Sequence, residues 1–233
     1  MKIAVVGHGK MGKEVVKAAS NKGYEVVAIV ARGDDMRKKV GASDVVIDFS
    51  VPADASSHFA RLFGCGLPVV IGSTGWEKER ASVKALAENE GIAVLAGANF
   101  SVGMACFRFA LRSLLQIPWM AEHYVAGGVE IHHADKRDAP SGTAKAISCE
   151  LGVNFAPLRL GKVAGTHTVI FDSADDMIEL AHRAKSRAGF ATGALAAAEW
   201  LIGRRGFFSF DDFVAECLTP KEAPCPSPLS SQP

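Results

Sequence analysis

The sequence lacks the charge excess, the long apolar runs and the cysteine patterns that mark several large classes of protein. Its Lys and Arg residues number 26 and its Asp and Glu residues 25, so the net charge is +1, whereas nucleic-acid binders usually carry a strong basic excess. No apolar run approaches the roughly 20 residues that span a bilayer. The opening residues MKIAVVG lack the features of a secretory signal. We therefore expect neither nucleic acid nor a membrane as a partner.

The cysteines are few and show no metal-binding or disulfide pattern. They are odd in number, and no two form a Cys-x-x-Cys pair; they are Cys65, Cys106, Cys149, Cys217 and Cys225. This spacing argues against a disulfide framework and against a zinc site. We expect no metal, and a cytoplasmic location in which the thiols stay reduced.

Short apolar runs and helical patterns alternate through the first half of the chain. The pattern predicts strands at 3–6, 25–30, 44–49, 68–72 and 92–95, and helices at 11–22, 52–63 and 77–91. Strict alternation is typical of right-handed βαβ units and a parallel sheet. The near-continuous apolar strands indicate a sheet that is covered on both faces.

The pattern changes after Asn99. It predicts helices at 102–116, 143–151 and 189–202, strands at 129–133, 166–172 and 177–181, and a short closing segment at 210–214. The two strands at 166–181 are expected to be antiparallel, which indicates a second, smaller α+β region. Residues 221–233 are rich in Pro and Ser, and this composition predicts a disordered tail.

A glycine-rich loop follows the first predicted strand and opens the first predicted helix. Residues 7–12 (GHGKMG) fit the pattern G-x-G-x-x-G, and this context favours a dinucleotide-binding loop. Gly7 would allow a tight turn, Gly9 a close approach to the pyrophosphate, and Gly12 close packing of helix on strand. Lys10 and Met11 lie in the first helical turn, where unpaired N–H groups favour phosphate, so we count them among the candidate cofactor-binding residues.

The second predicted strand ends without the acidic residue that usually binds the ribose 2′-hydroxyl. Arg32 lies there instead, and an arginine at that place suits a 2′-phosphate. The sequence therefore favours NADPH. NADH remains the alternative, because Asp34 or Asp35 would serve as the ribose acid.

The densest group of chemically capable residues lies at 130–144 (EIHHADKRDAPSGTA). His132 and His133 end a predicted strand, so their side chains should point to opposite faces. Lys136 follows in a loop. Histidine titrates near neutrality and lysine can be tuned by its surroundings, which suits both to proton transfer.

The same segment predicts the start of a helix. Asp138 is the expected N-cap, with Pro140 in the first turn. The N–H groups of Ser141, Gly142 and Thr143 would then be unpaired and could bind a carboxylate of the substrate.

Segment 130–144 resembles the signature E-x-H-H-x-x-K-x-D-A-P-S-G-T-A of the 4-hydroxy-tetrahydrodipicolinate (dihydrodipicolinate) reductase family of bacterial lysine and diaminopimelate synthesis. Other similar segments occur in the same order over residues 1 to 218; they are VIDFS (46–50), IGSTG (71–75), NFSVG (99–103), GTHTV (165–169), SR (186–187) and FATGA (190–194). The resemblance implies NAD(P)H-dependent reduction of a small cyclic dicarboxylate with a C=N bond.

The resemblance also implies an architecture. A Rossmann-type dinucleotide-binding domain with a parallel sheet would comprise residues 1–101 and 188–220. An α+β domain with a mixed sheet, residues 102–187, would bind the substrate and form the oligomer, a homotetramer or a homodimer. The chain is shorter than typical members between Leu151 and Gly161, which lies in this oligomer domain.

Finally, the resemblance implies roles for individual residues. His132 would be the catalytic proton donor or acceptor and Lys136 a proton donor, while His133, Gly142 and Thr143 would bind substrate. The residues expected to line the nicotinamide and its ribose are Gly72, Ser73, Thr74, Gly97, Ala98, Asn99 and Phe100. Two alternatives remain open: another NAD(P)-linked reductase of imines or amino acids, and an NADP-sensing protein without turnover.

Overall fold

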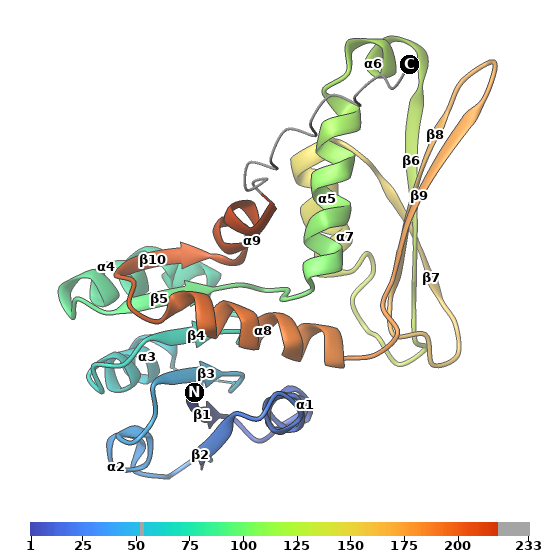
Figure 1. Cartoon of the computed structure of the whole chain (residues 1–233). Coiled ribbons are helices and arrows are strands. Elements are labelled where there is room, and N and C mark those ends of the chain that lie inside the picture. The colour runs from blue at the N-terminus through green and yellow to red at the C-terminus, as the bar shows by residue number, and fades with distance from the viewer. Residues whose placement is uncertain (52–53, 219–233) are drawn as a thin grey trace, which may run out of the picture.

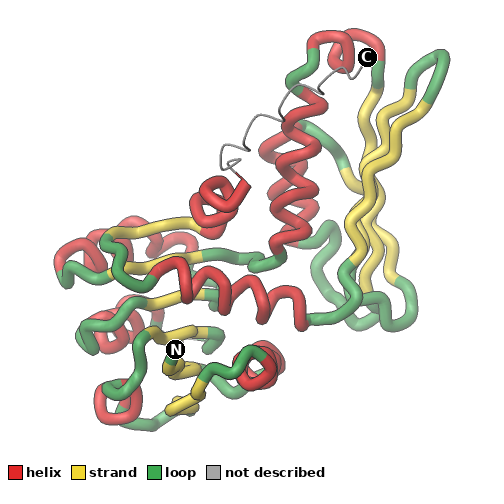
Figure 2. The backbone as a smooth tube through the Cα atoms, viewed as in Figure 1, coloured by secondary structure: helices red, strands yellow, loops and turns green. Residues whose placement is uncertain are grey.

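The computed structural model describes residues 1–51 and 54–218, and its elements build two sheets with helices packed on them (Figure 1, Figure 2). The larger sheet has six parallel strands in the order β10–β5–β4–β3–β1–β2. Its strands are β1 (Lys2–Val6), β2 (Glu25–Val30), β3 (Val45–Asp48), β4 (Val69–Ile71), β5 (Ala93–Ala96) and β10 (Gly206–Ser209). β1 lies between β2 and β3, so the direction of winding reverses there.

Helices cover both faces of this parallel sheet, as the apolar strands predicted. One apolar core joins the sheet to α1 (Lys10–Asn21), α8 (Ala188–Leu201) and α9 (Phe210–Leu218). A second core joins the opposite face to α2 (Met36–Val40), α3 (Ala55–Phe63) and α4 (Arg80–Asn89), which follows the short 3-10 helix η1 (Glu77–Glu79). Figure 1 shows the two helical layers on either side of the strands. The predicted α/β class is thereby confirmed.

The smaller sheet has four strands in the order β7–β6–β8–β9. They are β6 (Val125–His132), β7 (Phe155–Arg159), β8 (Thr166–Asp172) and β9 (Met177–Arg183). β6 and β7 are parallel and the other pairs antiparallel, so the sheet is mixed. Helices α5 (Val102–Leu115) and α7 (Gly142–Leu151) pack on one face, and α6 (Pro118–His123) follows α5.

Four elements were not predicted from the sequence: α2, α6, β7 and β10. β7 contains Pro157, which has no N–H to give to a ladder, and proline is found in sheets mainly on edge strands, where β7 lies. β10 is a four-residue edge strand. The predicted closing segment at 210–214 is the start of helix α9.

Two sequence predictions meet the limits of the described residues. The predicted tail at 221–233 lies outside them, as do residues 52–53 at the start of the predicted helix 52–63, of which α3 is the described part. Within residues 1–51 and 54–218, no helix is both long and apolar enough to cross a membrane.

Candidate active site

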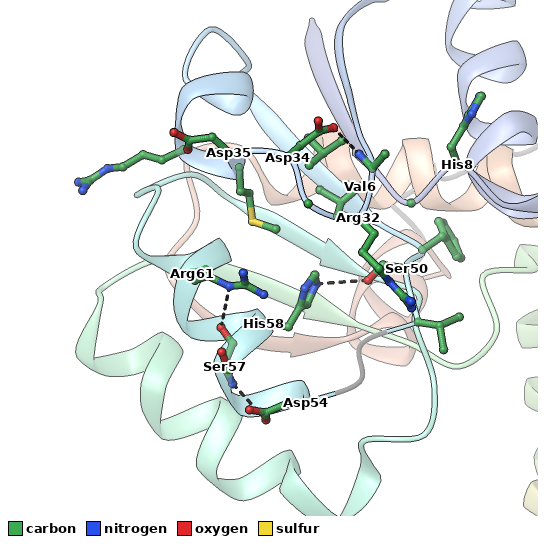
Figure 3. Close-up of a pocket in the computed structure, with 18 of the residues that line it drawn as sticks. Val6, His8, Arg32, Asp34, Asp35, Ser50, Asp54, Ser57, His58 and Arg61 are labelled. Carbon is green, nitrogen blue, oxygen red and sulfur yellow. Dashed lines mark hydrogen bonds between the residues drawn. The ribbon is translucent and has the colours of Figure 1, made fainter.

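A cavity of about 890 Å³ lies at the carboxyl ends of β1, β2 and β3 (Figure 3). This is the point at which the winding of the parallel sheet reverses, and ligands of open α/β sheets bind at such points. Three of the predicted cofactor residues line the cavity: Gly7, Gly9 and Arg32. Its size and position fit one half of a dinucleotide.

Gly7 and Gly12 have the backbone roles that their spacing predicted, a tight turn and close packing of the helix. Gly7 has a φ of +94°, and a Cβ there would lie 2.8 Å from the backbone of Phe49 and Ser50. A Cβ on Gly12 would lie 1.9 Å from the Gly7 carbonyl oxygen, so the helix packs directly on the turn. Gly9 faces open space and is the N-cap of α1, without a side chain to pair the first N–H groups. The first turn of α1 is therefore free to receive a phosphate.

Charged side chains of both signs line this cavity, and the acidic ones are Asp34, Asp35 and Asp54. Arg37 and Arg61 line it together with Arg32, and Figure 3 shows Arg32 and Arg61 beside His58. Asp34 accepts hydrogen bonds from the Ala31 N–H at 2.7 Å and from Lys39 Nζ at 2.6 Å. The bond from Lys39 and then that from Ala31 lower the pKa of Asp34. The Asp34 carboxylate is therefore already hydrogen-bonded to its own loop and to α2.

The loops after β4 and β5 carry the remaining predicted cofactor residues. A Cβ on Gly72 would lie 2.1 Å from the Phe49 ring, so only glycine fits there. Ser73 is buried and donates to Asp48 at 3.2 Å, whereas Thr74 and Ala98 are exposed. Gly97, in the loop after β5, packs against α9, because a Cβ added to it would lie 3.0 Å from Phe210 Cβ.

Two further residues of these loops have opposite surroundings. The Phe100 ring is buried between Phe49 and Phe210, so its side chain belongs to the core. Asn99 Nδ2 donates to Thr143 Oγ1 at 3.2 Å. This bond joins a predicted cofactor-binding loop to the start of α7, which carries the predicted substrate-binding residues.

A row of polar side chains crosses the helix-covered face of the mixed sheet. Glu130 and His132 are two residues apart on β6 and share this face, where both are buried. Glu130 is directly opposite His167 of β8, and His167 is opposite His182 of β9. Strand periodicity thus brings together groups that are far apart in the sequence.

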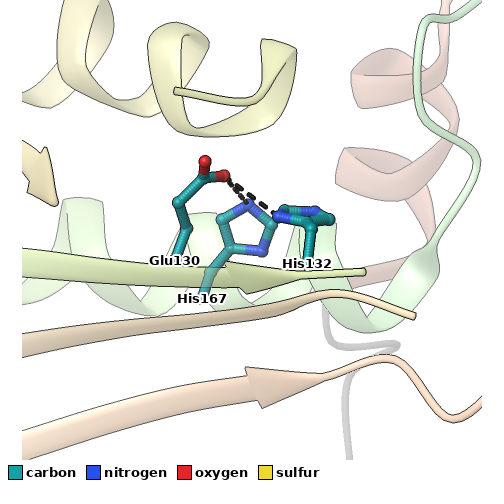
Figure 4. A group of neighbouring side chains, drawn as sticks. All are labelled: Glu130, His132 and His167. Atoms are coloured by element: carbon teal, nitrogen blue, oxygen red, sulfur yellow. Dashed lines mark ion pairs between the residues drawn. The ribbon is translucent and has the colours of Figure 1, made fainter. Parts of the chain in front are cut away.

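Glu130 lies at the centre of this row and has no exposed surface (Figure 4). Its Oε1 accepts hydrogen bonds from the Ser141 N–H at 2.9 Å and from Arg159 Nη2 at 3.0 Å. Its Oε2 lies 3.3 Å from His132 Nδ1 and 3.7 Å from His167 Nε2. Figure 4 shows both imidazoles facing the same carboxylate oxygen.

The protonation of this cluster follows from burial and from these contacts. Burial alone would raise the pKa of Glu130, but the bonds from Ser141 and Arg159 outweigh it and lower that pKa. Burial lowers the pKa of His132, with Lys136 and Arg159 acting in the same direction and Glu130 against it. Burial, followed by the neighbouring His132, lowers the pKa of His167 to about 4. Near neutral pH the carboxylate is charged and both imidazoles are neutral.

Lys136 lies in the loop between β6 and α7. Its Nζ donates to Asp138 Oδ1 at 2.8 Å and to Oδ2 at 3.0 Å, and this bond lowers the pKa of Asp138. Arg159 donates to the backbone carbonyls of Lys136 and Asp138 as well as to Glu130. Arg159 therefore ties the Lys136 loop to the buried carboxylate.

The start of α7 differs in three details from the sequence prediction, one of which is that Pro140 precedes the N-cap and does not lie in the first turn. Ser141, not Asp138, is the N-cap: its Oγ accepts from the Ala144 N–H at 3.2 Å. The prediction that the Ser141 N–H is unpaired is also wrong, because the buried Glu130 accepts it. The hydroxyl of Ser141 lies 3.2 Å from His167 Nε2. Ser141 thus fastens α7 to the sheet, while Gly142 is exposed and Thr143 partly so.

The cysteine spacing leads us to expect no metal, and one side-chain cluster of the structure has the composition of a metal site. In the structure, one ligand atom each of Glu130, His132 and His167 lie within 4.8 Å of one another. The Arg159 guanidinium already bonds the same carboxylate, and Lys136 adds a second positive charge nearby. A further cation would be repelled there, so this cluster suits proton handling better than metal binding.

Several of these residues escaped the sequence analysis. Arg159 lies on β7, which was not predicted, and His167 is brought beside Glu130 only by the pairing of β6 with β8. Arg61 and His58 reach the cofactor cavity from α3. The signal in the sequence that could have found them is a charged residue or a histidine within an otherwise apolar strand or helix, where such residues are rarely buried without a partner.

Comparisons with known proteins point in one direction. The family model for the N-terminus of dihydrodipicolinate reductase matches residues 1–100, and the one for its C-terminus matches residues 116–214. The 4-hydroxy-tetrahydrodipicolinate reductase of Christiangramia forsetii is 33% identical over 237 residues, which cover 93% of this chain and 98% of that protein. The enzyme of the same name from Thermosipho africanus is 34% identical over 225 residues, covering 94% and 100%.

Solved structures share the fold. The dipicolinate-bound dihydrodipicolinate reductase from Paenisporosarcina sp. TG-14 superimposes with a TM-score of 0.75 at 20% identity, covering 91% of this chain and 98% of that one. A diaminopimelate dehydrogenase from C. glutamicum superimposes with a TM-score of 0.53 at 14% identity, covering 96% and 99%.

Proposed function

The chain belongs to the dihydrodipicolinate reductase family, and on that premise we propose how its residues divide the work of reducing 4-hydroxy-tetrahydrodipicolinate. The protein is an NAD(P)H-dependent oxidoreductase of lysine and diaminopimelate biosynthesis. Its two sheets have separate tasks in this proposal. The parallel sheet holds the dinucleotide, and the mixed sheet holds the substrate and moves protons.

The dinucleotide, when bound, supplies the hydride. The loop of Gly7 and Gly9 and the first turn of α1 (Lys10, Met11) hold its pyrophosphate. Arg32 binds a 2′-phosphate, and its place in the cavity lining supports NADPH as the preferred cofactor. Because Asp34 is already bonded to Ala31 and Lys39, it is poorly placed to serve as a ribose acid for NADH. The loops 72–74 and 97–100 receive the nicotinamide and its ribose.

The substrate carboxylate binds at the start of α7 in this proposal. Gly142 and Thr143 present backbone N–H groups at a helix N-terminus, where an anion is favoured. The Gly142 N–H bonds the Asp138 carboxylate, so the substrate carboxylate would replace Asp138 there. His133 adds a side-chain contact. His132 transfers the proton that the ring requires, and Lys136 supplies a second proton and stabilises developing negative charge. Ser141 contributes by fastening α7, since its N–H and hydroxyl are engaged.

One observation carries the proposal: the bond from Asn99 to Thr143. It connects the loop after β5, at the end of the parallel sheet where the nicotinamide belongs, to the helix that would hold the substrate. Hydride transfer requires the two reactants to be held in contact at about 3–3.5 Å. A direct bond between the two binding segments fits that requirement.

The exposed face of the mixed sheet supports an oligomer of this chain. α5 and α7 cover one face only, and apolar side chains on these strands are exposed, such as Val125 at 78% and Met177 at 61%. A patch of this kind on a sheet commonly marks an interface. We propose a homotetramer or homodimer through this face, located in the cytoplasm with its reductant. Light scattering of the purified protein would report the mass, and a monomer at micromolar concentration would contradict the proposal.

The test of the proposed function is a coupled assay. The preceding synthase would generate substrate from pyruvate and aspartate semialdehyde, and NADPH and NADH oxidation would be followed in parallel. We expect oxidation that depends on the synthase product and is faster with NADPH. Arg32→Gln should lower the NADPH-to-NADH ratio of kcat/KM roughly tenfold, the loss of one charge-assisted bond.

The control is Lys84→Gln, an exposed cation on α4, which should leave the ratio unchanged. Folded protein that binds NADPH but oxidises neither cofactor would contradict the reductase and favour a sensor or a different imine substrate. An unchanged cofactor ratio in Arg32→Gln would contradict only the role of Arg32.

A further inference from the structure

We propose that Glu130 is a positioning residue that holds His132 through Nδ1 and so presents its Nε2 to the substrate. The inference deepens the proposed function and rests on the assignment of His132 to proton transfer. It concerns a residue that the sequence analysis did not select. The contacts of the two Glu130 carboxylate oxygens and of the two His132 ring nitrogens support it.

The first step is the anchoring of Glu130. Ser141 N–H and Arg159 both bond Oε1, and the two donors come from different elements, the start of α7 and the edge strand β7. These bonds fix the orientation of the carboxylate. As a result the other oxygen, Oε2, is held toward the two imidazoles.

The second step is that Oε2 has an unused bonding capacity. Among the described residues, neither Oε2 nor His132 Nδ1 makes an aligned hydrogen bond, although both are buried and 3.3 Å apart. Unpaired buried polar atoms destabilise a fold, so stability does not explain this pair. Contacts of catalytic groups are often long in the free enzyme and tighten when the substrate binds. The arrangement is that of a group held ready for a reaction.

The third step concerns the far side of the His132 ring. Gly165, which precedes β8, lies beside the His132 ring, and a Cβ added to it would lie 3.1 Å from His132 Nε2. A side chain at position 165 would therefore crowd Nε2, and glycine leaves the approach to this nitrogen unobstructed from that side. If Nδ1 carries a proton directed at Glu130, Nε2 is the basic nitrogen. A proton then enters and leaves at Nε2, and Glu130 stays ionised throughout.

The charges around His132 explain why the carboxylate is needed. Lys136 and Arg159 face the ring as cations, Asp138 and Glu130 face it as anions, and the neighbouring His167 is neutral near pH 7. Asp138 is bonded to Lys136 and lies at the exposed loop. Glu130 is therefore the buried anion that offsets the two cations whenever His132 carries a second proton.

The test compares Glu130→Gln with the wild-type protein. Glutamine keeps an oxygen that can accept the Ser141 N–H, so the anchor of α7 is preserved while the charge is lost. We expect kcat to fall about 10- to 100-fold, the usual effect of losing such a partner, with KM changed less than about twofold. The limb of the pH–rate profile that reports His132 should move to lower pH. NMR of the His132 imidazole should show the same shift of its titration without substrate.

Glu150→Gln is the matched control, because Glu150 is also a carboxylate held by arginines in this half of the molecule, on α7. It should leave kcat and the His132 titration unchanged. A Glu130→Gln protein with an unmoved His132 titration would overturn the proposal, whether its activity is normal or is lost through instability. His132→Gln distinguishes a failure of the proposed function from a failure of this inference. An active His132→Gln protein would contradict the proposed role of His132 in proton transfer. The coupling of His132 to Glu130 is still tested by comparing the His132 titration of the wild-type and Glu130→Gln proteins.

Discussion

Each sheet of this protein contains one fully buried carboxylate beside a histidine, and the two carboxylates are treated differently. Asp48, at the end of β3, accepts bonds from the Ser50 N–H at 2.9 Å and from Ser73 Oγ at 3.2 Å, and lies 3.2 Å from His58 Nε2. Both of its oxygens are used. Glu130, on β6, uses Oε1 for two strong donors and leaves Oε2 without a hydrogen bond among the described residues.

The difference separates a structural carboxylate from one held for chemistry. Asp48 joins three segments: the loop after β3 and helix α3, which line the cofactor cavity, and the loop after β4. Its partners include a backbone N–H and a hydroxyl, and hydrogen bonding to both oxygens is what stability requires of a buried carboxylate. Glu130 instead combines a guanidinium, a helix N-terminus and two imidazoles around one charge. Such a combination shifts pKa values and is typical of functional sites.

The largest expected effect comes from removing the histidine beside each carboxylate. His132→Ala should lower kcat by about 10²-fold or more, because it removes the general acid–base group. His58→Ala should act mainly on the KM for the cofactor, because His58 lines the dinucleotide cavity. Steady-state kinetics of both variants would check this contrast. An unchanged kcat in His132→Ala would remove His132 from proton transfer.

Lys136→Ala tests the other half of the proton machinery. We expect a loss of kcat on the same scale of about 10²-fold, since the Lys136 ammonium faces the same region as His132. Measurement of kcat and KM separately decides the role: an increase in KM alone would make Lys136 a binding residue.

A smaller effect is expected in the acid stability of the Glu130 cluster. The pKa of His167 is lowered from 6.5 to about 4 by burial, so the unfolded chain binds more protons than the folded one between these values. Stability should therefore fall as the pH drops from about 6.5 to 4, by about 3 kcal/mol from this group. The lowered pKa of Glu130 adds a loss below about pH 4.5.

Urea unfolding as a function of pH would measure this dependence. His167→Gln should flatten the profile between about pH 6.5 and 4, whereas His123→Gln, at a half-exposed side chain on α6, should not. An equally steep profile in His167→Gln would show that His167 is not held neutral in the folded protein.

The parallel sheet and its cofactor cavity, where Asp48 lies, could be predicted from the sequence better than the contacts of Glu130 on the mixed sheet. The βαβ alternation and the glycine loop report local physics: apolar strands, a turn at Gly7 and close packing at Gly12. These suffice to place a cofactor cavity at the strand ends. His132, Lys136 and the start of α7 were also found, because they lie within a dozen residues of one another in the sequence.

The contacts of Glu130 depend instead on the pairing of distant strands. His167 reaches it through the register of β6 with β8, and Arg159 through the parallel register of β6 with β7. Neither register is encoded in a short segment. The N-cap was misplaced for a local reason: Asp138 is a good N-cap by type, but Lys136 holds its carboxylate, and Ser141 takes the position.

The smallest expected effect is the loss of charge at Asp48. Asp48→Asn keeps the size and one carbonyl oxygen, but an amide N–H₂ replaces an acceptor that now serves Ser73 and faces His58. The unfolding free energy should fall by about 2 kcal/mol, the scale for a buried polar group that loses its partner. Urea denaturation at pH 7 would measure it.

Asp48→Asn is informative when it is compared with Glu130→Gln, because both variants exchange an acid for an amide. Asp48→Asn should act mainly on the unfolding free energy, whereas Glu130→Gln should act mainly on kcat. In Glu130→Gln the Oε2 atom that changes has no hydrogen bond to lose, but the variant also loses the charge that pairs with Arg159 at 3.0 Å. The distinguishing effect is therefore on kcat, which Glu130→Gln should disturb more than Asp48→Asn does. Should both variants lose stability equally while keeping the same kcat, the two carboxylates would be equivalent structural groups. The unpaired oxygen of Glu130 would then be a packing defect and not a provision for proton transfer.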